Sequence, residues 1–149
     1  MYNDFALTGD WMRSSLSDLE IVINAGVRTV VYDGDADYIL NYIGVEAMVR
    51  EFILPCSFFP AFALTSSSHA QVDSLNASTS PLFANQNFAN YTVNGEPAGL
   101  YKNAGTFSYL RVFGAGHEVP AYLWRGVARG AAALQMFMQI MSDQPLSGT

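Results

Sequence analysis

Charged residues are scarce in this chain of 149 residues. Only 13% of the residues are charged while 50% are hydrophobic, and an average soluble domain carries about 25% charged residues. This composition is typical of a piece that buries much of its surface against another protein part. Basic residues are also few, and a net charge of −6 with a pI near 4.6 disfavours a nucleic-acid partner, because an acidic surface repels phosphates.

Long apolar runs are missing as well. No continuous apolar stretch reaches the roughly 18 residues that a transmembrane helix needs, so we expect neither a membrane span nor a membrane partner. The first five residues have no basic start and no apolar run, and they do not form a signal peptide. For a secreted protein we therefore expect the signal to lie upstream of this sequence.

Cysteine is almost absent, because Cys56 is the only one and an internal disulfide is impossible. A single cysteine is either a buried thiol or, in a secreted protein, a candidate for a disulfide to a second chain. Two glycosylation sequons begin at Asn76 and Asn90. These sequons indicate an oxidising, secretory setting, and a disulfide from Cys56 to a second chain would require the same setting.

The first fifty residues predict a helix, a strand and a second helix. Helical spacing begins at Trp11, behind a possible cap at Asp10, and stops at Gly26. Residues 27–32 are rich in valine and alternate little, which is typical of a strand buried on both faces of a parallel sheet. Residues 42–52 again show helical spacing.

The middle of the chain differs in composition from both ends. Residues 53–90 begin with an aromatic, proline-broken stretch and continue with serine and asparagine, which predicts a surface excursion that is mostly loop with one short helix over 64–87. Downstream, Asn94-Gly95 is a strong signal for a two-residue hairpin turn. We expect strands at 88–93, 99–102 and 106–113 and a terminal helix at 127–141.

Two polar turns follow two of these strands. Residues 33–38, here called the acid turn, come after the strand at 27–32, and residues 114–120, the histidine turn, come after the strand at 106–113. An acid behind one strand and a histidine behind a later one is the order in which the second half of a Ser–Asp–His triad occurs in α/β-hydrolases. The two turns therefore predict half of a catalytic site.

Asp37 is the candidate acid of that site. A triad needs a carboxylate that holds the histidine in one tautomer and stabilises its charged form. The acid turn also contains Asp33 and Asp35, and Asp-x-Asp-x-Asp resembles the start of a calcium-binding loop. Such a loop would need a glycine where Tyr38 stands and a glutamate where Gly44 stands. We therefore expect no metal at this turn.

His117 is the candidate base. The only other histidine, His69, lies in the serine-rich loop, where we expect it to be solvated. His117 follows Gly-Ala-Gly, and such small residues let the backbone bend sharply behind a strand. A lone histidine after a strand is more often structural, but the matching acid turn upstream favours a catalytic role.

Both turns resemble the motifs of the serine carboxypeptidase family, and of its fungal members most. Residues 34–38 read Gly-Asp-Ala-Asp-Tyr and, with Asn41 and Gly44, resemble the aspartate motif. Residues 116–120 read Gly-His-Glu-Val-Pro and resemble the histidine motif. The resemblance implies the C-terminal part of an α/β-hydrolase fold, with a mixed, mostly parallel sheet and flanking helices.

The resemblance also implies roles for single residues. Asp37 would be the triad acid, and His117 the general base and then the general acid. Ile39 and Leu40 would line the pocket for the side chain before the scissile bond. Glu118 would line the pocket of the departing C-terminal residue, where a carboxylate favours a basic or polar residue; its alternative is a simple exposed side chain.

The chain also departs from the family pattern. The family's glutamine-proline pair after the histidine motif is absent, and residues 121–127 begin a connection to the last helix that we expect to be longer than in the family. Residues 53–90 carry no family motif. The Gly-x-Ser-x-Gly elbow of the nucleophile is absent too. We therefore expect residues 1–149 to be the C-terminal portion of one domain, paired with an N-terminal chain of the same precursor that carries the serine and the oxyanion hole.

Three functions remain open at this point. The favoured one is a carboxypeptidase that releases C-terminal amino acids from peptides through an acyl-enzyme, without a cofactor. The second is an acyltransferase or a hydroxynitrile lyase built on the same scaffold, and the third is an inactive relative. We expect the protein to be secreted or to reside in an acidic compartment such as a vacuole or lysosome.

Overall fold

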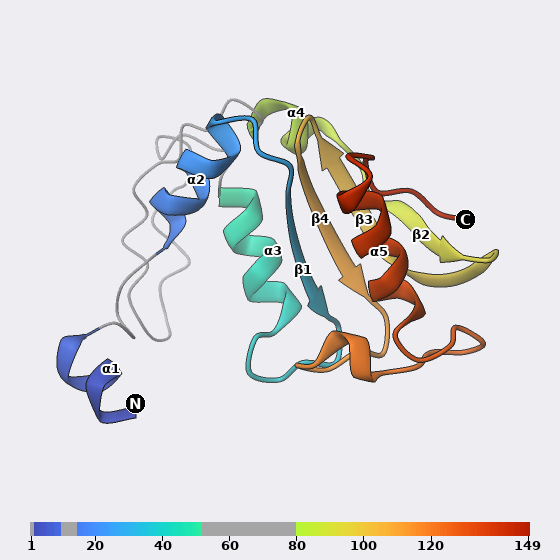
Figure 1. Ribbon diagram of the computed structural model, residues 1–149, viewed down its shortest axis with the longest axis horizontal. Coiled ribbons are helices and arrows are strands. Elements are labelled where there is room, and N and C mark those ends of the chain that lie inside the picture. Colours follow the sequence, from blue (N-terminus) through green and yellow to red (C-terminus); the bar gives the residue numbers. More distant parts are fainter. Residues whose placement is uncertain (1, 10–14, 52–79) are drawn as a thin grey trace, which may run out of the picture.

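A computed structural model describes residues 2–9, 15–51 and 80–149, and its centre is a four-stranded sheet in the order β1-β4-β3-β2 (Figure 1). The elements in chain order are α1 (Tyr2–Thr8), α2 (Leu16–Asn24), β1 (Thr29–Gly34), α3 (Tyr42–Glu51), α4 (Ser80–Asn85), β2 (Ala89–Val93), β3 (Glu96–Ala104), β4 (Phe107–Val112), the 3₁₀ turn η2 (Val119–Ala121) and α5 (Ala131–Met141).

The sheet is mixed. Strand β1 runs parallel to β4, with Thr29 opposite Phe107, whereas β4 with β3 and β3 with β2 are antiparallel. The predicted α/β architecture with flanking helices is confirmed, but the prediction of a mostly parallel sheet is wrong for the described residues. The reason is local: tight turns at Asn94-Gly95 and Gly105 join β2 to β3 and β3 to β4, and such short connections only join antiparallel strands.

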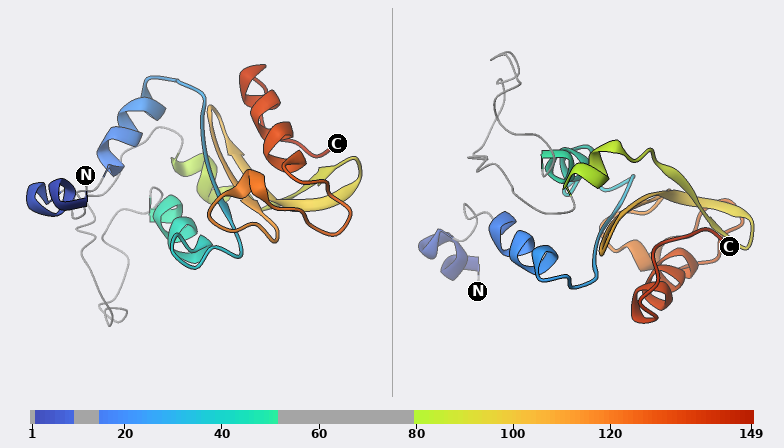
Figure 2. Two further views of the ribbon diagram at one scale, coloured as in Figure 1. Left: turned by 60° about the horizontal axis from the view of Figure 1, so that its bottom comes forward. Right: turned by 90° about the horizontal axis from the view of Figure 1, so that it is seen from above.

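Helices cover both faces of the sheet (Figure 2). On one face, Met136 of α5 belongs to a buried cluster with Leu110 and Val112 of β4. On the other face, Phe83 of α4 and Tyr109 of β4 lie in a second buried cluster, to which α2 and α3 also contribute. Strand β4 supplies both clusters because successive side chains of a strand point to opposite faces.

Glycine and asparagine set several element ends as the sequence predicts. Asn94 and Gly95 have φ values of 52° and 82°, the positive pair that a type I′ hairpin turn requires. Helix α2 ends just before Gly26, whose φ is 75°, a common way for a helix to stop. The prediction that this helix begins at Trp11 is wrong, because α2 begins at Leu16 with Ser15 as its N-cap; Asp10 and Trp11 themselves lie outside the described residues.

The terminal helix is shorter than predicted. It begins at Ala131 rather than at residue 127, because Gly130 has a φ of 72° and the preceding residues form a separate turn. The chain then returns along β2. The N–H of Thr149 donates to the carbonyl of Thr92 at 2.9 Å, and the side chain of Leu146 is only 1% exposed.

Several predicted features lie outside the described residues. These are Cys56, the sequon at Asn76, His69 and the part of the predicted excursion from residue 53 to residue 79. Within the ranges that the structure does describe, no helix is long and apolar enough to cross a membrane.

Candidate active site

The acid turn and the histidine turn lie against each other. Strands β1 and β4 are parallel neighbours, so their carboxyl ends open at the same edge of the sheet. Past that edge the backbones stay joined, because the N–H of Asp35 donates to Val112 at 3.0 Å and that of Ala36 to Ala115 at 2.9 Å. A side chain at Gly34 would come within 2.1 Å of the Ala115 carbonyl, so the close approach of the turns requires glycine there.

Asp37 and His117 form a direct hydrogen bond. Nδ1 of His117 lies 2.9 Å from Oδ2 of Asp37, while Oδ1 of Asp37 accepts the N–H groups of Ile39 at 2.8 Å and Leu40 at 3.1 Å. The Asp37 side chain is 7% exposed and the His117 side chain 59%. Because an ionised carboxylate only accepts hydrogen bonds, Nδ1 carries the proton and Nε2 is left as the basic nitrogen.

Opposing effects set the pKa of Asp37. Burial acts to raise this pKa, while the hydrogen bond from His117 and the two backbone N–H bonds act to lower it. The bonds outweigh burial, and the pKa of Asp37 lies below its usual value of 3.8. The carboxylate is therefore ionised at all but strongly acidic pH, as a group that orients a histidine must be.

The three aspartates of the acid turn have three different partners. Asp37 contacts His117, Oδ1 of Asp35 accepts the N–H of Gly114 at 2.6 Å, and Asp33 accepts the hydroxyl of Tyr109 at 3.0 Å. Across the described residues, no three histidine, cysteine, aspartate or glutamate side chains gather as a metal site would require. Each of the three carboxylates thus has a partner of its own.

Asp33 is the most buried of these acids and has the opposite shift. Burial raises its pKa to about 6, and nearby Glu46 adds to that rise. The hydroxyl of Tyr109 and the positive charge of Arg111 act in the lowering direction but do not cancel the effect of burial. Arg111 is itself paired with Glu46 at 2.9 Å, on the face of the sheet that α3 covers.

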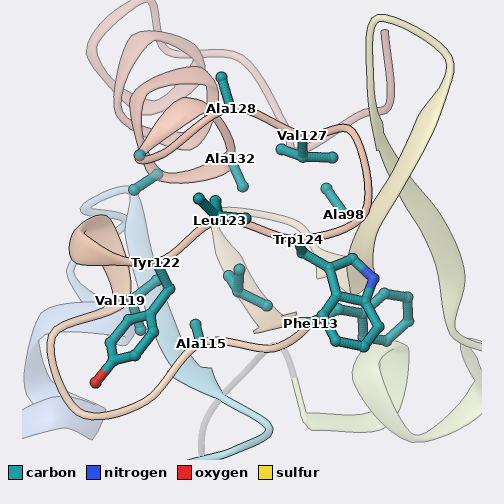
Figure 3. A pocket seen from close by; sticks show the side chains of 13 residues that line it. Ala98, Phe113, Ala115, Val119, Tyr122, Leu123, Trp124, Val127, Ala128 and Ala132 are labelled. Atoms are coloured by element: carbon teal, nitrogen blue, oxygen red, sulfur yellow. The ribbon is translucent and has the colours of Figure 1, made fainter.

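Two aromatic residues behind the histidine turn pack against its glycines. A side chain at Gly116 would come within 2.6 Å of the Tyr122 hydroxyl, and one at Gly114 within 2.1 Å of the Trp124 ring. Trp124 also lies beside Phe113 (Figure 3), and the centroids of the two rings are 6.4 Å apart. These contacts were not predicted from the sequence, where Gly114 and Gly116 stand several residues before the two aromatic residues.

The connection between the histidine turn and α5 has its own structure. Residues 124–127 form a tight turn in which Val127 donates to the carbonyl of Trp124 at 2.7 Å, with positive φ at Arg125 and Gly126. The buried Val127 and Ala115 line a small apolar hollow between the histidine turn and α5 (Figure 3). This segment therefore supports the histidine turn from the side of α5.

The predicted substrate-binding residues lie close to Asp37 and His117 in the sequence and are exposed. Ile39 and Leu40 directly follow the acid, with Ile39 76% exposed, and Glu118 is exposed next to the histidine. Asn90, the sequon in the described part of the chain, is exposed on β2. The imidazole of His117 and its neighbours Ile39, Leu40 and Glu118 thus face solvent, whereas the carboxylate of Asp37 is buried.

Comparison with known proteins identifies the family. Residues 3–143 match the sequence pattern of the family described as serine carboxypeptidase. The chain belongs to the serine carboxypeptidase family. The match is continuous through residues 53–90, which no motif of the sequence had connected to the family, and membership implies an α/β-hydrolase fold.

Fungal and plant serine carboxypeptidases are among the similar proteins. Carboxypeptidase S1 of Penicillium janthinellum is 38% identical over 148 residues, which are 99% of this chain and 28% of that protein. Carboxypeptidase Y of Schizosaccharomyces pombe is 32% identical over 117 residues, 78% of this chain and 9% of that protein. Serine carboxypeptidase-like 47 of Arabidopsis thaliana is 28% identical over 139 residues, 93% of this chain and 22% of that protein.

These comparisons confirm the resemblance to fungal serine carboxypeptidases. They also show that this chain spans between 9% and 28% of the length of the three relatives. A protein part more than twice as long as this chain therefore has no counterpart here.

Proposed function

We propose that this chain supplies the acid and the base of a serine carboxypeptidase active site. In this proposal residues 1–149 are the C-terminal portion of one α/β-hydrolase domain, and an N-terminal chain of the same precursor carries the serine and the oxyanion hole. The observation that carries it is the 2.9 Å contact between Asp37 and His117, at the carboxyl edge of two parallel strands in a chain of this family.

The proposed reaction proceeds through an acyl-enzyme. The serine oxygen attacks the scissile carbonyl carbon while Nε2 of His117 takes the serine proton, and the carbonyl electrons move onto oxygen. When the carbonyl re-forms, the C–N bond breaks, and His117 protonates the leaving nitrogen of the C-terminal amino acid. Water then attacks the acyl ester through the same proton relay, which releases the shortened peptide and restores the serine. Asp37 remains ionised throughout.

The openness of the site supports a companion chain. The His117 side chain is 59% exposed, although a general base works best where water is excluded. Apolar side chains of the segment after Asp37 face outward as well, such as Ile39 at 76% and Ile43 at 65% exposed. Among the described residues no strand pairs with the outer edge of β1. An additional protein part lying here would cover all of these groups.

Substrate preference and setting follow from neighbouring residues in the proposal. Ile39 and Leu40 contribute an apolar wall for the side chain before the scissile bond, and Glu118 favours a polar or basic leaving residue. Sequons at Asn76 and Asn90 and the odd Cys56 support a secreted or vacuole-like location with glycans and an interchain disulfide.

The test is peptidase activity of the purified protein with any chain that accompanies it. We expect release of the C-terminal amino acid from N-blocked dipeptides at acidic pH, loss of that release in a His117→Ala variant, and its retention in Asp18→Asn, a change of an exposed aspartate on α2. Release by the His117→Ala variant at the original rate would contradict the site. Transfer of the acyl group to an added alcohol without hydrolysis would instead indicate an acyltransferase.

A further inference from the structure

The two turns are joined by a side chain that the proposed triad does not use. Oδ1 of Asp35 accepts the N–H of Gly114 at 2.6 Å and so connects residues 79 positions apart in the chain. Hydrogen bonds to an ionised carboxylate are about twice as strong as those between neutral groups. Asp35 is also partly shielded from water, which would otherwise compete for the bond.

Gly114 is held between this carboxylate and an aromatic ring. The antiparallel ladder of the sheet ends just before it, where the N–H of Phe113 donates to the carbonyl of Ala98 at 2.9 Å. Gly114 then turns with a φ of 63°, and Trp124 packs so closely that no side chain could be added. Its N–H needs a partner beyond the ladder, because an unpaired backbone group in a shielded place is costly, and Asp35 provides that partner.

The position of this bond matters for the histidine. Two backbone bonds also hold this region together, from Asp35 to Val112 at the end of β4 and from Ala36 to Ala115, and both have a main-chain donor that only a proline substitution would remove. The Asp35–Gly114 bond is a side-chain bond placed three residues before His117. A shift of Gly114 would move the segment that carries the imidazole ring.

The geometry points to Asp35 as a positioning residue that fixes the histidine turn so that Nδ1 of His117 stays within hydrogen-bond reach of Asp37. Asp35 touches neither the substrate nor the reacting atoms in this account. Its effect on catalysis rests on the proposed function, whereas its effect on the Asp37–His117 hydrogen bond does not.

Three variants at Asp35 separate position from charge. Asp35→Asn removes the charge but keeps an acceptor oxygen at the same place. Asp35→Glu keeps the charge but moves the acceptor by one methylene, and Asp35→Ala removes the acceptor altogether. A positioning role predicts that Asn preserves the site better than Glu, whereas a role for the negative charge near His117 predicts the reverse order.

The first readout is the Nδ1 proton of His117, observed by NMR as a strongly downfield signal in the complete purified protein and assigned with a His117→Gln variant. We expect this signal to persist in Asp35→Asn, to weaken in Asp35→Glu and to vanish through exchange with water in Asp35→Ala. Far-UV circular dichroism on the same samples reports whether each variant is folded. If Asp35→Ala does not fold, the order of Asn and Glu still decides the question.

The second readout is peptidase kinetics. A displaced general base costs turnover, and a misplacement of about 1 Å can cost about 100-fold in rate. We expect Asp35→Ala to lower kcat by about 10- to 100-fold with KM nearly unchanged, and Asp35→Asn to stay within about threefold. In a His117→Ala background the Asp35→Ala change should have almost no further effect, because residues that act as one unit are not additive.

The outcomes also distinguish this inference from the proposed function. A protein without peptidase activity whose NMR signal follows the expected order would contradict the proposed function and leave the positioning role intact. An active protein in which Asn, Glu and Ala are equally harmless, or in which Glu is better than Asn, would overturn the positioning role alone.

Discussion

The two edges of the sheet differ in how far this chain itself covers them. Along β2, the C-terminal residues run beside the strand, Thr149 bonds to Thr92, and Leu146 is buried. Along β1, no described strand pairs with the outer edge, and Ile43 of the adjacent helix α3 lies largely in solvent. Among the described residues, the β2 edge is thus covered by the C-terminal segment and the β1 edge has no strand beside it, and the proposed companion chain would lie along the β1 edge.

The Asp37–His117 pair near the open edge should show the largest effect. We expect His117→Ala to lower kcat by about 10⁴- to 10⁶-fold and Asp37→Asn by about 10⁴-fold, as in other triads. Because His117 is mostly exposed, His117→Ala should change the free energy of unfolding of the protein by only about 0.5 kcal/mol or less. Steady-state kinetics and urea unfolding check this pair of values, and a variant whose activity falls only through unfolding would contradict it.

Leu146 tests the completed edge. Replacing this buried side chain by alanine leaves a cavity, and we expect the free energy of unfolding to fall by about 2–4 kcal/mol. The matched control is Leu134→Ala on α5, where the leucine is exposed and the expected change is about 0.5 kcal/mol or less. Equal losses at the two leucines in urea unfolding would show that the tail does not complete the β2 edge.

Ile43 tests the open edge. If a companion chain covers α3, a charge introduced by Ile43→Lys must be desolvated in the complex, and we expect the companion to bind about 10- to 100-fold more weakly. Leu82→Lys on α4 changes an apolar residue of similar exposure, 56% against 65% for Ile43, on a helix that packs against β3, and it should leave binding unchanged. The affinity is measured by titrating this chain with the companion chain. A similar loss of affinity in both variants would show that the companion does not prefer the β1 edge.

Asp33 on β1 gives the smallest expected effect, a dependence of stability on pH. Its pKa is raised from 3.8 to about 6 on folding, so above pH 6 the folded protein holds a costly buried charge, and this cost disappears as pH falls toward 4. We expect Asp33→Asn to stabilise the fold by about 1–2 kcal/mol at pH 8 and by almost nothing near pH 4. Thermal unfolding from pH 4 to pH 8 measures the difference in stability between Asp33→Asn and the unchanged protein. A difference that grows as the pH falls would contradict this explanation.

Much of this fold could be predicted from sequence, because local rules decide it. Asn94-Gly95 specifies its hairpin turn through two positive φ values, Gly26 ends its helix, and the valine-rich run forms the strand β1 that pairs in parallel. The prediction of a mostly parallel sheet was wrong because the direction of a strand depends on the length of the connection before it. The short turns at Asn94-Gly95 and Gly105 decide it more directly than the hydrophobic pattern of the strands does.

The site was predictable only in part, for a related reason. The order of the two turns predicted that Asp37 and His117 would meet, since parallel neighbouring strands end at one edge. Nothing local distinguishes Asp33 and Asp35 from Asp37, because the role of each carboxylate depends on what the fold places opposite it. The partners, Tyr109 for Asp33 and Gly114 for Asp35, are more than 70 positions away in sequence.

The central claim is that this chain supplies the acid and the base for a serine that it does not carry. Labelling the complete purified protein with a serine-directed phosphonofluoridate, followed by peptide mass spectrometry, tests this claim most directly. The account predicts one modified serine, located on a companion chain, and no modification when His117 is replaced by alanine. A modified serine within residues 1–149, or equal labelling of the His117→Ala variant, would contradict it.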